Sequence, residues 1–469
     1  MATDIAPDAE GGVGLQPAST LTLGLEERPP LPQAVALGFQ HVLVSNVWLD
    51  PVFVAAVGGL SAALAANLVN AIFLAAGLVT LTQSTKLVRL PIVEGPSAAF
   101  DGLMIGFAKA GQLAMATTGL LIGGVLVLIV AASGLLGLVR RLFSPAVTGS
   151  VILLVGVALA GFTLEEFLGG NPTSPDFGSP QTLAISTATL LTVLLLSAFG
   201  TGPWRAYAFI WGLLVGDGLS LVFGRLSFEA ATSAAWIGIP QFLPYGGLQF
   251  DAGVTLALLF AFLVAIIEAI GVYYAAGEIV GTPITDQRIR LGVSGEAAGS
   301  IISSLFGGFA TTAYAQNVGL LKLTGVGSRF AVTVAGIIFL VLAFIPKLGA
   351  VLAATPDPVV GGIFLPAAAS LIMTGVAALA RTPDTPRHAA VGGLAVIMGT
   401  GLPPLVTGLA PKLPRVVTQL LSQPVVVGAI VALVLEIVLV QIPNWLPHRG
   451  AAATGGGTPT VLNVRGDFE

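Results

Sequence analysis

Long, unbroken runs of apolar residues recur along this chain and limit what it can fold into. The runs at 117–138 and 252–267 contain no charged residue. About 20 consecutive apolar residues are needed for a helix to cross a bilayer, and these runs do not alternate as the strands of a membrane barrel would. The runs therefore predict an all-α polytopic membrane protein.

Composition agrees with this prediction and excludes several classes of function. The chain is 55% hydrophobic and only 9% charged, whereas a soluble domain has about 25% charged residues. A net charge of -4 gives no basis for binding nucleic acid. Absence of cysteine excludes disulfides and thiolate sites, and His41, His388 and His448 are too scattered for a histidine metal site. We expect no metal, no cofactor and no nucleic-acid partner.

The apolar segments divide into two sets of seven. Residues 32–224 hold the first seven and residues 251–445 the second, with a connecting loop at 225–250. An odd number of spans in each half makes the second half inverted relative to the first. Placing both termini in the cytoplasm puts fourteen lysines and arginines inside and five outside, as the positive-inside rule requires. The tails at 1–31 and 446–469 are expected to be disordered.

Two of the segments, the third and the tenth, are interrupted by glycine, proline and polar residues. The third contains Pro91–Gly102, and the tenth contains the polar stretch 310–325. Ser97 comes 64 residues after the first segment begins, and Gln316 comes 65 after the eighth begins. Paired breaks at matching places indicate a transporter site near the membrane midplane. Ordinary glycine kinks are the alternative; we favour a site, with Thr311, Thr312, Gln316 and Asn317 at its floor, because both breaks carry polar residues.

Several acidic residues lie in or beside apolar segments. Glu268 is a lone carboxylate deep in the eighth segment, where burial disfavours its charged form. It is a candidate proton carrier or acceptor for a substrate N–H, unless neighbouring helices satisfy it. Glu296, at the start of the ninth segment, is either functional or a favourable charge at a helix N-terminus. Glu94 and Asp101 flank the third-segment break, either buried or facing an aqueous vestibule.

The remaining candidates are polar or aromatic. Gln316 offers a donor and an acceptor, which suits a ring edge that presents N–H beside C=O. Asn317 is expected to fix the local backbone. Phe100 could stack on a planar ring, although a core position is equally consistent with the sequence. His41, on an apolar helix, is more often a packing or hydrogen-bonding histidine than a ligand.

These motifs together resemble the nucleobase–ascorbate transporters, a family that includes uracil, xanthine and fungal purine permeases. The family signature matches Gln316-Asn317-Val318-Gly319 followed by Thr324-Gly325. Further matching stretches are Gly38–His41, Pro91–Ser97, Glu268–Gly271, Gly327–Arg329 and Phe344–Ala350. The likeness covers roughly residues 33–445.

The resemblance implies a fourteen-helix, seven-plus-seven inverted repeat with core and gate domains, an elevator-like motion and a homodimer formed through the gate. It also implies short strands at the broken third and tenth segments. Glu268 matches the acid that binds the base, and Gln316 matches a side chain that contacts the base beside the Ala315 backbone. Ser97 and the Ala98 backbone occupy the matching position in the third segment. Glu296 resembles an acid that some xanthine permeases need, and His41 matches the first-helix histidine.

This sequence departs from the family at three positions. Ala98 stands where many members have phenylalanine, so the stacking ring is missing unless Phe100 supplies it. Val272 stands where many members have aspartate or histidine. Asp101 is an additional acid, assigned with Glu296, His41, Asn317 and Thr312 to coupling or support. These departures leave the substrate and the coupling ion open.

The sequence therefore predicts a nucleobase uptake permease of a bacterial cytoplasmic membrane, coupled to protons or alternatively to sodium. Gln316 favours a purine of the xanthine or uric acid type over uracil or another pyrimidine. A sulfate or bicarbonate transporter on the same fold would need a positive site, and no lysine or arginine lies near the motif acids in the sequence. A membrane-embedded enzyme is disfavoured because no catalytic pair is visible. A channel would need no coupling acid.

Overall fold

The computed structural model of the protein describes residues 21–137 and 142–445. Within these ranges, eight helical segments are long and apolar enough to cross a membrane. They are α1–α2 (Leu31–Val57), α3 (Ala62–Thr85), α5 (Leu113–Ser133), α7 (Pro145–Phe167), α8 (Pro180–Phe199), α12 (Ala252–Val280), α17 (Asp357–Leu379) and α21 with its π-helical extension η3 (Pro424–Gln441).

Other apolar segments are short, bent or broken. A ninth span results if α15 (Arg329–Ala343) and α16 (Pro346–Ala353), which meet at 86°, are counted as one. The shorter helices are α10 (Ala208–Val222) and α18 (Pro386–Gly401), whereas α13 (Asp286–Leu305) has 20 residues but is less apolar. Small connecting helices are α9 (Pro203–Ala206), α11 (Glu229–Ser233), α19 (Pro403–Leu409), η2 (Ala410–Lys412), α20 (Arg415–Leu421) and α22 (Ile442–Trp445). Helix length alone thus accounts for eight or nine spans, and the count of fourteen stays a prediction.

The third and tenth predicted segments begin with extended chain in this structure. The third consists of β1 (Glu94–Pro96), the 3-10 turn η1 (Ala98–Phe100) and α4 (Asp101–Lys109). The tenth consists of β2 (Thr311–Ala313) and α14 (Ala315–Thr324). The two strands pair with each other in one antiparallel sheet, so segments from the two halves of the chain meet in the interior.

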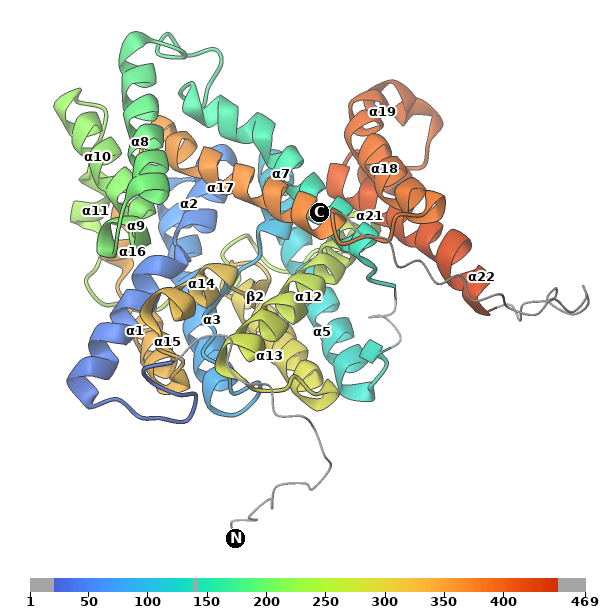
Figure 1. Ribbon diagram of the computed structural model, residues 1–469. Helices are drawn as coiled ribbons and strands as arrows, with labels where there is room; N and C mark the ends of the chain where they lie inside the picture. The colour runs from blue at the N-terminus through green and yellow to red at the C-terminus, as the bar shows by residue number, and fades with distance from the viewer. Residues whose placement is uncertain (1–20, 138–141, 446–469) are drawn as a thin grey trace, which may run out of the picture.

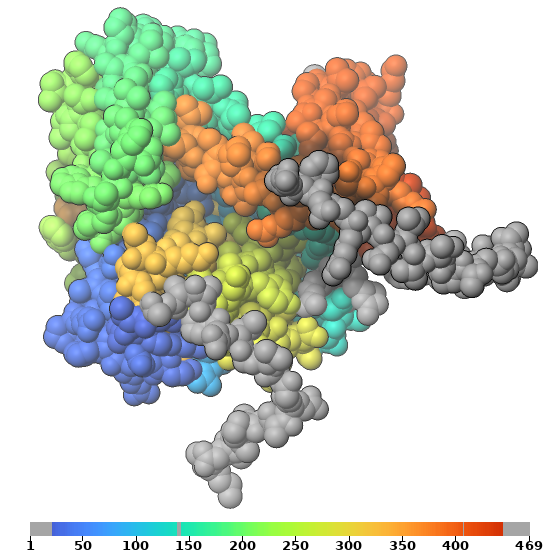
Figure 2. Space-filling model, in the orientation of Figure 1, coloured from blue at the N-terminus to red at the C-terminus, as the bar shows by residue number. Residues whose placement is uncertain are grey.

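Helices from the two halves pack reciprocally. The second segment of the first half, α3, packs on the fourth of the second half, α15, and α5 packs on α13 in the same way. Likewise α8 packs on α17, and α18 packs on α7. In Figure 1, α3, α5, α12, α13 and α15 form a lower group, while α7, α8, α17, α18 and α21 lie above it. The space-filling view shows the lobe that contains α8 and the lobe that contains α18 standing apart (Figure 2).

Close helix crossings depend on glycine. A Cβ on Gly149 of α7 would lie 2.6 Å from the backbone nitrogen of Leu379, and one on Gly156 would lie 2.9 Å from the Ala368 carbonyl. Small residues let membrane helices approach closely where the hydrophobic effect does not drive their association. The α7–α17 contact therefore has no room for larger side chains.

Residues 21–30, which the sequence assigns to a disordered tail, make ordered contacts in the structure. Leu23 pairs with Val326, and the Gly327 amide donates to the Leu23 carbonyl at 2.8 Å. Glu26 pairs with Arg329 at 2.7 Å and with Arg89 at 2.9 Å. Backbone pairing and ion pairs, which hydropathy does not report, hold this segment against the α14–α15 connection. Residues 1–20 and 446–469, the rest of the predicted tails, lie outside the described residues.

Candidate functional site

The site is built where β1 and β2 pair. Glu94 lies opposite Ala313, Gly95 opposite Thr312, and Pro96 opposite Thr311. This pairing satisfies backbone groups that would otherwise be costly in the middle of a membrane. A Cβ on Gly95 would lie 2.8 Å from the Tyr314 ring, so glycine is needed there for the strands to meet. Because the two strands are antiparallel, α4 and α14 leave from opposite ends of this short interior sheet.

A cavity of about 620 Å³ opens beside these helix starts. Its walls come from η1, α12 and α14 on one side and from α7 and α17 on the other. The polar residues and named candidates in its lining are Ala98, Glu268, Val272, Ala315, Gln316, Thr148, Ser370, Thr374 and Arg381. The volume is within the range of about 300–1,000 Å³ typical of small-molecule sites. We call it the central cavity.

Four of the predicted binding residues line this cavity together. Glu268 comes from the middle of α12, Gln316 and Ala315 from the first turn of α14, and Ala98 from η1. Ser97 does not line the cavity but donates its hydroxyl to Glu268 Oε2 at 3.2 Å. The cavity thus presents a carboxyl acceptor, an amide with both donor and acceptor, and backbone near the start of a helix.

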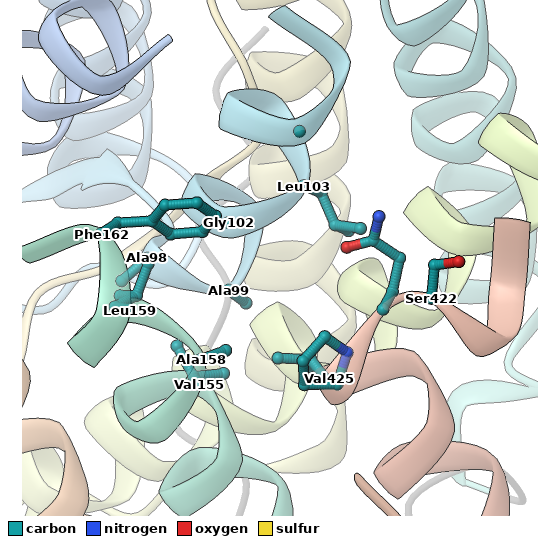
Figure 3. A pocket seen from close by; sticks show the side chains of 13 residues that line it. Ala98, Ala99, Gly102, Leu103, Val155, Ala158, Leu159, Phe162, Ser422 and Val425 are labelled. Carbon is teal, nitrogen blue, oxygen red and sulfur yellow. The ribbon is translucent and has the colours of Figure 1, made fainter. Parts of the chain in front are cut away.

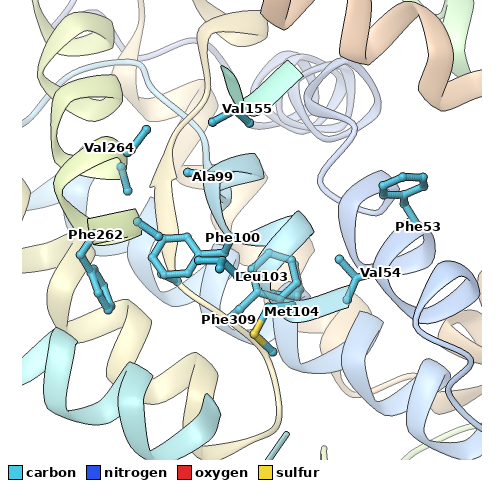
Figure 4. Close-up of a cluster of buried hydrophobic side chains, with 14 of the residues drawn as sticks. Phe53, Val54, Ala99, Phe100, Leu103, Met104, Val155, Phe262, Val264 and Phe309 are labelled. Atoms are coloured by element: carbon cyan, nitrogen blue, oxygen red, sulfur yellow. The ribbon is translucent and has the colours of Figure 1, made fainter. Parts of the chain in front are cut away.

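The prediction that Phe100 could stack on a ligand does not hold in this structure. Phe100 is fully buried and packs edge to face against Phe262, with the ring centroids 5.1 Å apart. It belongs to an apolar cluster with Leu103 and Met104 (Figure 4). Phe100 does not line the central cavity, so in this structure it does not replace the missing phenylalanine. No aromatic residue of the described chain lines the central cavity.

Three supporting residues hold the helix starts in place. Asn317 Nδ2 lies 3.0 Å from Nδ1 of His41 and donates to the His41 carbonyl at 3.1 Å. Thr312 donates its hydroxyl to the Ala265 carbonyl at 3.2 Å. These buried bonds fix α14 to α1 and β2 to α12. His41 therefore makes a hydrogen bond and does not line the cavity.

Glu296 lies outside the central cavity. Tyr273 donates its hydroxyl to Glu296 Oε1 at 2.9 Å, and the Glu94 and Glu296 carboxyls interact with each other. The alternative of a charge at a helix N-terminus is wrong, because α13 begins at Asp286 and Glu296 lies in its middle. The apolar segment begins ten residues after the helix does, so the start of the segment was taken for the start of the helix.

Asp101 is completely buried and does not face an open vestibule. Neither of its carboxyl oxygens has a hydrogen-bond partner among the described residues, and it lies near Asp50 and Glu268. Asp50 accepts a hydrogen bond from the Tyr314 hydroxyl at 3.0 Å. The sequence reasoning missed Asp50, which lies in no motif, and passed over Tyr314, although Tyr314 lies within the polar stretch 310–325.

Comparison with known proteins decides the family. Residues 32–408 match the model of a permease family, the nucleobase–ascorbate transporters. The chain belongs to this permease family.

Its relatives are transporters rather than enzymes. The nucleobase transporter PlUacP of Paenibacillus larvae is 30% identical over 86% of this chain and 94% of its own. The uric acid permease PucJ of Bacillus subtilis is 29% identical over 86% of this chain and 91% of its own. The transmembrane domain of the cyanobacterial bicarbonate transporter BicA covers 89% of this chain and 100% of its own, with a TM-score of 0.57 and 17% identity. That likeness concerns the fold alone.

The wall of this permease's cavity that the sequence reasoning missed comes from α7 and α17. It includes Thr148, Ser370, Thr374 and Arg381. Arg381, just after α17, lines the same cavity as Glu268, so the cavity contains a basic residue that the sequence neighbourhood of the acids does not reveal. Ser370 and Thr374 are four residues apart in an apolar helix, which puts them on one face. The four-residue spacing of Ser370 and Thr374 is the sequence signal that could have identified this wall of the cavity.

Proposed function

We propose that this permease carries a nucleobase into the cell and that this nucleobase is a purine of the xanthine or uric acid type. The carrying observation is that Glu268 of α12 and Gln316 of α14, both in the second half of the chain, line one cavity with Ala315 and with Ala98 of the first half. A purine edge presents N–H groups beside C=O groups. A carboxylate accepts from the former, and an amide can pair with both.

The preference for a purine has two supports. Gln316 occupies the signature position where glutamine is characteristic of the xanthine and uric acid branch of the resemblance. One relative is named a uric acid permease. A uracil or other pyrimidine permease is the alternative within the family.

Transport is proposed to be coupled to a proton, with sodium as the alternative ion. Glu268 and Asp101 are carboxyls in a largely apolar interior, and their charge is costly to move through a membrane unless a proton or a ligand compensates it. Substrate binding between Glu268 and Gln316 would then lower the cost of crossing for the protonated, loaded form.

The motion is proposed to be elevator-like. The cavity lies between the group that contains η1, α12 and α14 and the group that contains α7 and α17. Reciprocal packing of helices from the two halves supports a seven-plus-seven inverted repeat with fourteen spans. We further propose a bacterial cytoplasmic membrane location, both termini in the cytoplasm, and a homodimer through the gate domain formed by α7, α8, α10, α17, α18 and α21.

An anion transporter of the sulfate or bicarbonate type is the second candidate. Arg381 in the cavity wall favours it, and so does the fold shared with BicA. Glu268 in the same cavity opposes it, because a carboxylate repels an anion.

Ligand-induced thermal stabilisation of the purified protein tests the proposal. The ligands are xanthine, uric acid, hypoxanthine, adenine, guanine, uracil, ascorbate and sulfate, since a ligand that binds only the folded state raises the apparent Tm. We expect a purine to stabilise the wild type and to lose this effect in Glu268→Gln. Glu278→Gln is the matched control, because Glu278 is an exposed glutamate of the same helix. Stabilisation by sulfate alone would move the assignment to the anion transporter.

A further inference from the structure

A second cavity adjoins the central one at η1. It has a volume of about 270 Å³ and is lined by η1, α4, α7 and the α20–α21 junction. It shares Ala98, Ala99 and Val155 with the central cavity. Figure 3 shows η1 and α4 with Leu103 on one side, α7 with Phe162 and Leu159 on another, and Ser422 and Val425 opposite.

The two cavities occupy successive stretches of α7. The central cavity touches α7 at Thr148, Ile152 and Val155, whereas the second touches it at Val155, Ala158, Leu159 and Phe162. Because α7 is long enough to span a membrane, the cavities lie toward opposite ends of that span. Residues of the short η1 turn and Val155 line both cavities and so lie at their junction.

The second cavity contains an aromatic ring, which the central one lacks, and a side-chain amide comparable to that of Gln316 in the central one. Phe162 brings an aromatic ring, and Gln423 brings a side-chain amide. No described residue hydrogen-bonds that amide, so its donor and acceptor are available to a ligand. Lys109 Nζ lies 5.3 Å from the centroid of the Phe162 ring, which keeps the ring beside α4.

Two glycines keep this cavity open on the α4 side. A Cβ built on Gly106 would lie 3.7 Å from Gln423 Nε2, and one on Gly102 would lie 3.9 Å from Leu159. Both are ordinary contact distances, so larger residues there would occupy the cavity without striking the backbone. Gly106 thus offers a way to fill the cavity while leaving the fold intact.

We propose that the second cavity is a reception subsite for the transported heterocycle. Gln423 pairs with the N–H and C=O groups of the ring edge, and Phe162 contacts the ring face. The inference rests on the proposed nucleobase function. Movement of η1 along α7 by one or two turns would carry the Ala98 wall, and with it the ligand, from this subsite to the side of Glu268 and Gln316.

Uptake kinetics in intact cells test the subsite, with xanthine and uric acid as the probes. The variants are Gln423→Ala, Phe162→Ala and the cavity-filling Gly106→Leu. Each should raise KM for uptake about five- to tenfold, the effect of one lost hydrogen bond or stacking contact. The maximal rate should change less than about twofold, because the groups act before the transport step. Gln249→Ala, at an exposed glutamine in the loop before α12, is the matched control.

Thermal stabilisation of the same purified variants separates this subsite from the central one. We expect the purine-induced rise in Tm that depends on Glu268 to be unchanged in Gln423→Ala and Gly106→Leu. Stabilisation of the wild type together with an unchanged KM in all three variants would overturn the subsite alone. If neither purine stabilises or enters with the wild type, the nucleobase function fails and the subsite fails with it. Gln423→Glu keeps the acceptor of this side chain, removes its donor and should also raise KM. The subsite therefore stays testable if Phe162→Ala does not fold.

Discussion

The polar signature residues of this permease have two different roles: one lines the central cavity, and the other positions the chain beside it. Asn317 follows the cavity-lining Gln316 by one position, yet it is completely buried and bonded to His41. A signature of adjacent polar residues thus divides into a contact side chain and an anchor. Helix geometry explains the division, because neighbouring residues on α14 point about 100° apart.

Replacing the anchor should damage the site indirectly. Asn317→Ala removes both bonds to His41 and leaves the His41 carbonyl without its partner. We expect a loss of about 1–3 kcal/mol in stability and weaker purine stabilisation, since the start of α14 would no longer be fixed. Melting with and without purine measures both effects. Gln316→Ala is the comparison: it should remove ligand stabilisation while leaving the Tm of the unliganded protein nearly unchanged, and the opposite pattern would contradict these roles.

Glu26 makes the N-terminal contact sensitive to acid. Its hydrogen bonds to the Arg329 guanidinium, together with the charges of Arg329 and Arg89, lower the pKa of Glu26 in the folded protein. A lowered pKa means that the ion pair stabilises the fold above the unfolded value, about 4.3 for glutamate. That stabilisation is lost as the pH falls through the lower, folded value.

Glu26→Gln should therefore lower the Tm at pH 7 and show a smaller further decline between pH 5 and pH 3 than the wild type. The effect is modest because the Glu26 side chain is half exposed. Differential scanning fluorimetry across this pH range measures it. Glu229→Gln, at an exposed glutamate of α11, should follow the wild-type curve; parallel curves for Glu26→Gln and wild type would show that the contact does not contribute.

At the scale of the element, sequence reasoning succeeded where hydropathy or a motif reports structure directly. The broken third and tenth segments, with Ser97 and Gln316, were found from glycine, proline and polar residues in apolar surroundings. The start of α13 was misplaced because its first two turns are polar and lie outside the apolar run. The inward direction of Phe100 could not be predicted, since it depends on the η1 turn. Asp50 and Arg381 were missed because only tertiary packing brings them to the site, whereas Tyr314 adjoins Ala315 in the sequence and was overlooked.

The α7–α17 crossing gives a prediction for helix packing. Gly156→Val places side-chain atoms against the Ala368 carbonyl and Ile372, so we expect a loss of about 1–3 kcal/mol in stability from overpacking. Gly161→Val on the same helix is the matched control, because nothing lies within 4 Å of a Cβ built there. Comparison of the Tm values of the two purified variants tests this prediction, and Gly156→Val should have the lower Tm. Equal Tm values would mean that the α7–α17 contact is looser than the structure indicates.

At the scale of the whole molecule, the two cavities lie toward opposite ends of the membrane span, so chemical labelling can distinguish one from the other. The chain has no cysteine, so single cysteines can be introduced without removing native ones. Ala377 lines the central cavity, and Ala158 lines the second.

We expect a membrane-impermeant maleimide to label Ala158→Cys from outside intact cells and Ala377→Cys only in inside-out vesicles. This pattern follows from the proposed orientation and from the opposite positions of the cavities along the membrane span. The wild type is the unlabelled control. Purine should slow labelling of Ala377→Cys if the cavity binds it. Labelling of both positions from the same side would refute the arrangement.

The pairing of β1 with β2 also has a consequence for biosynthesis. β1 is made early, but its partner strand follows only after the rest of the first half and α12 and α13 have left the ribosome. Until then the extended chain at Glu94–Pro96 has unpaired backbone groups, which the hydrocarbon interior does not tolerate. The first half must therefore shelter this segment, in water or within the translocation machinery, until the second half is delivered. The candidate site is consequently among the last parts of the protein to be assembled, and a truncated chain that ends before β2 cannot form it.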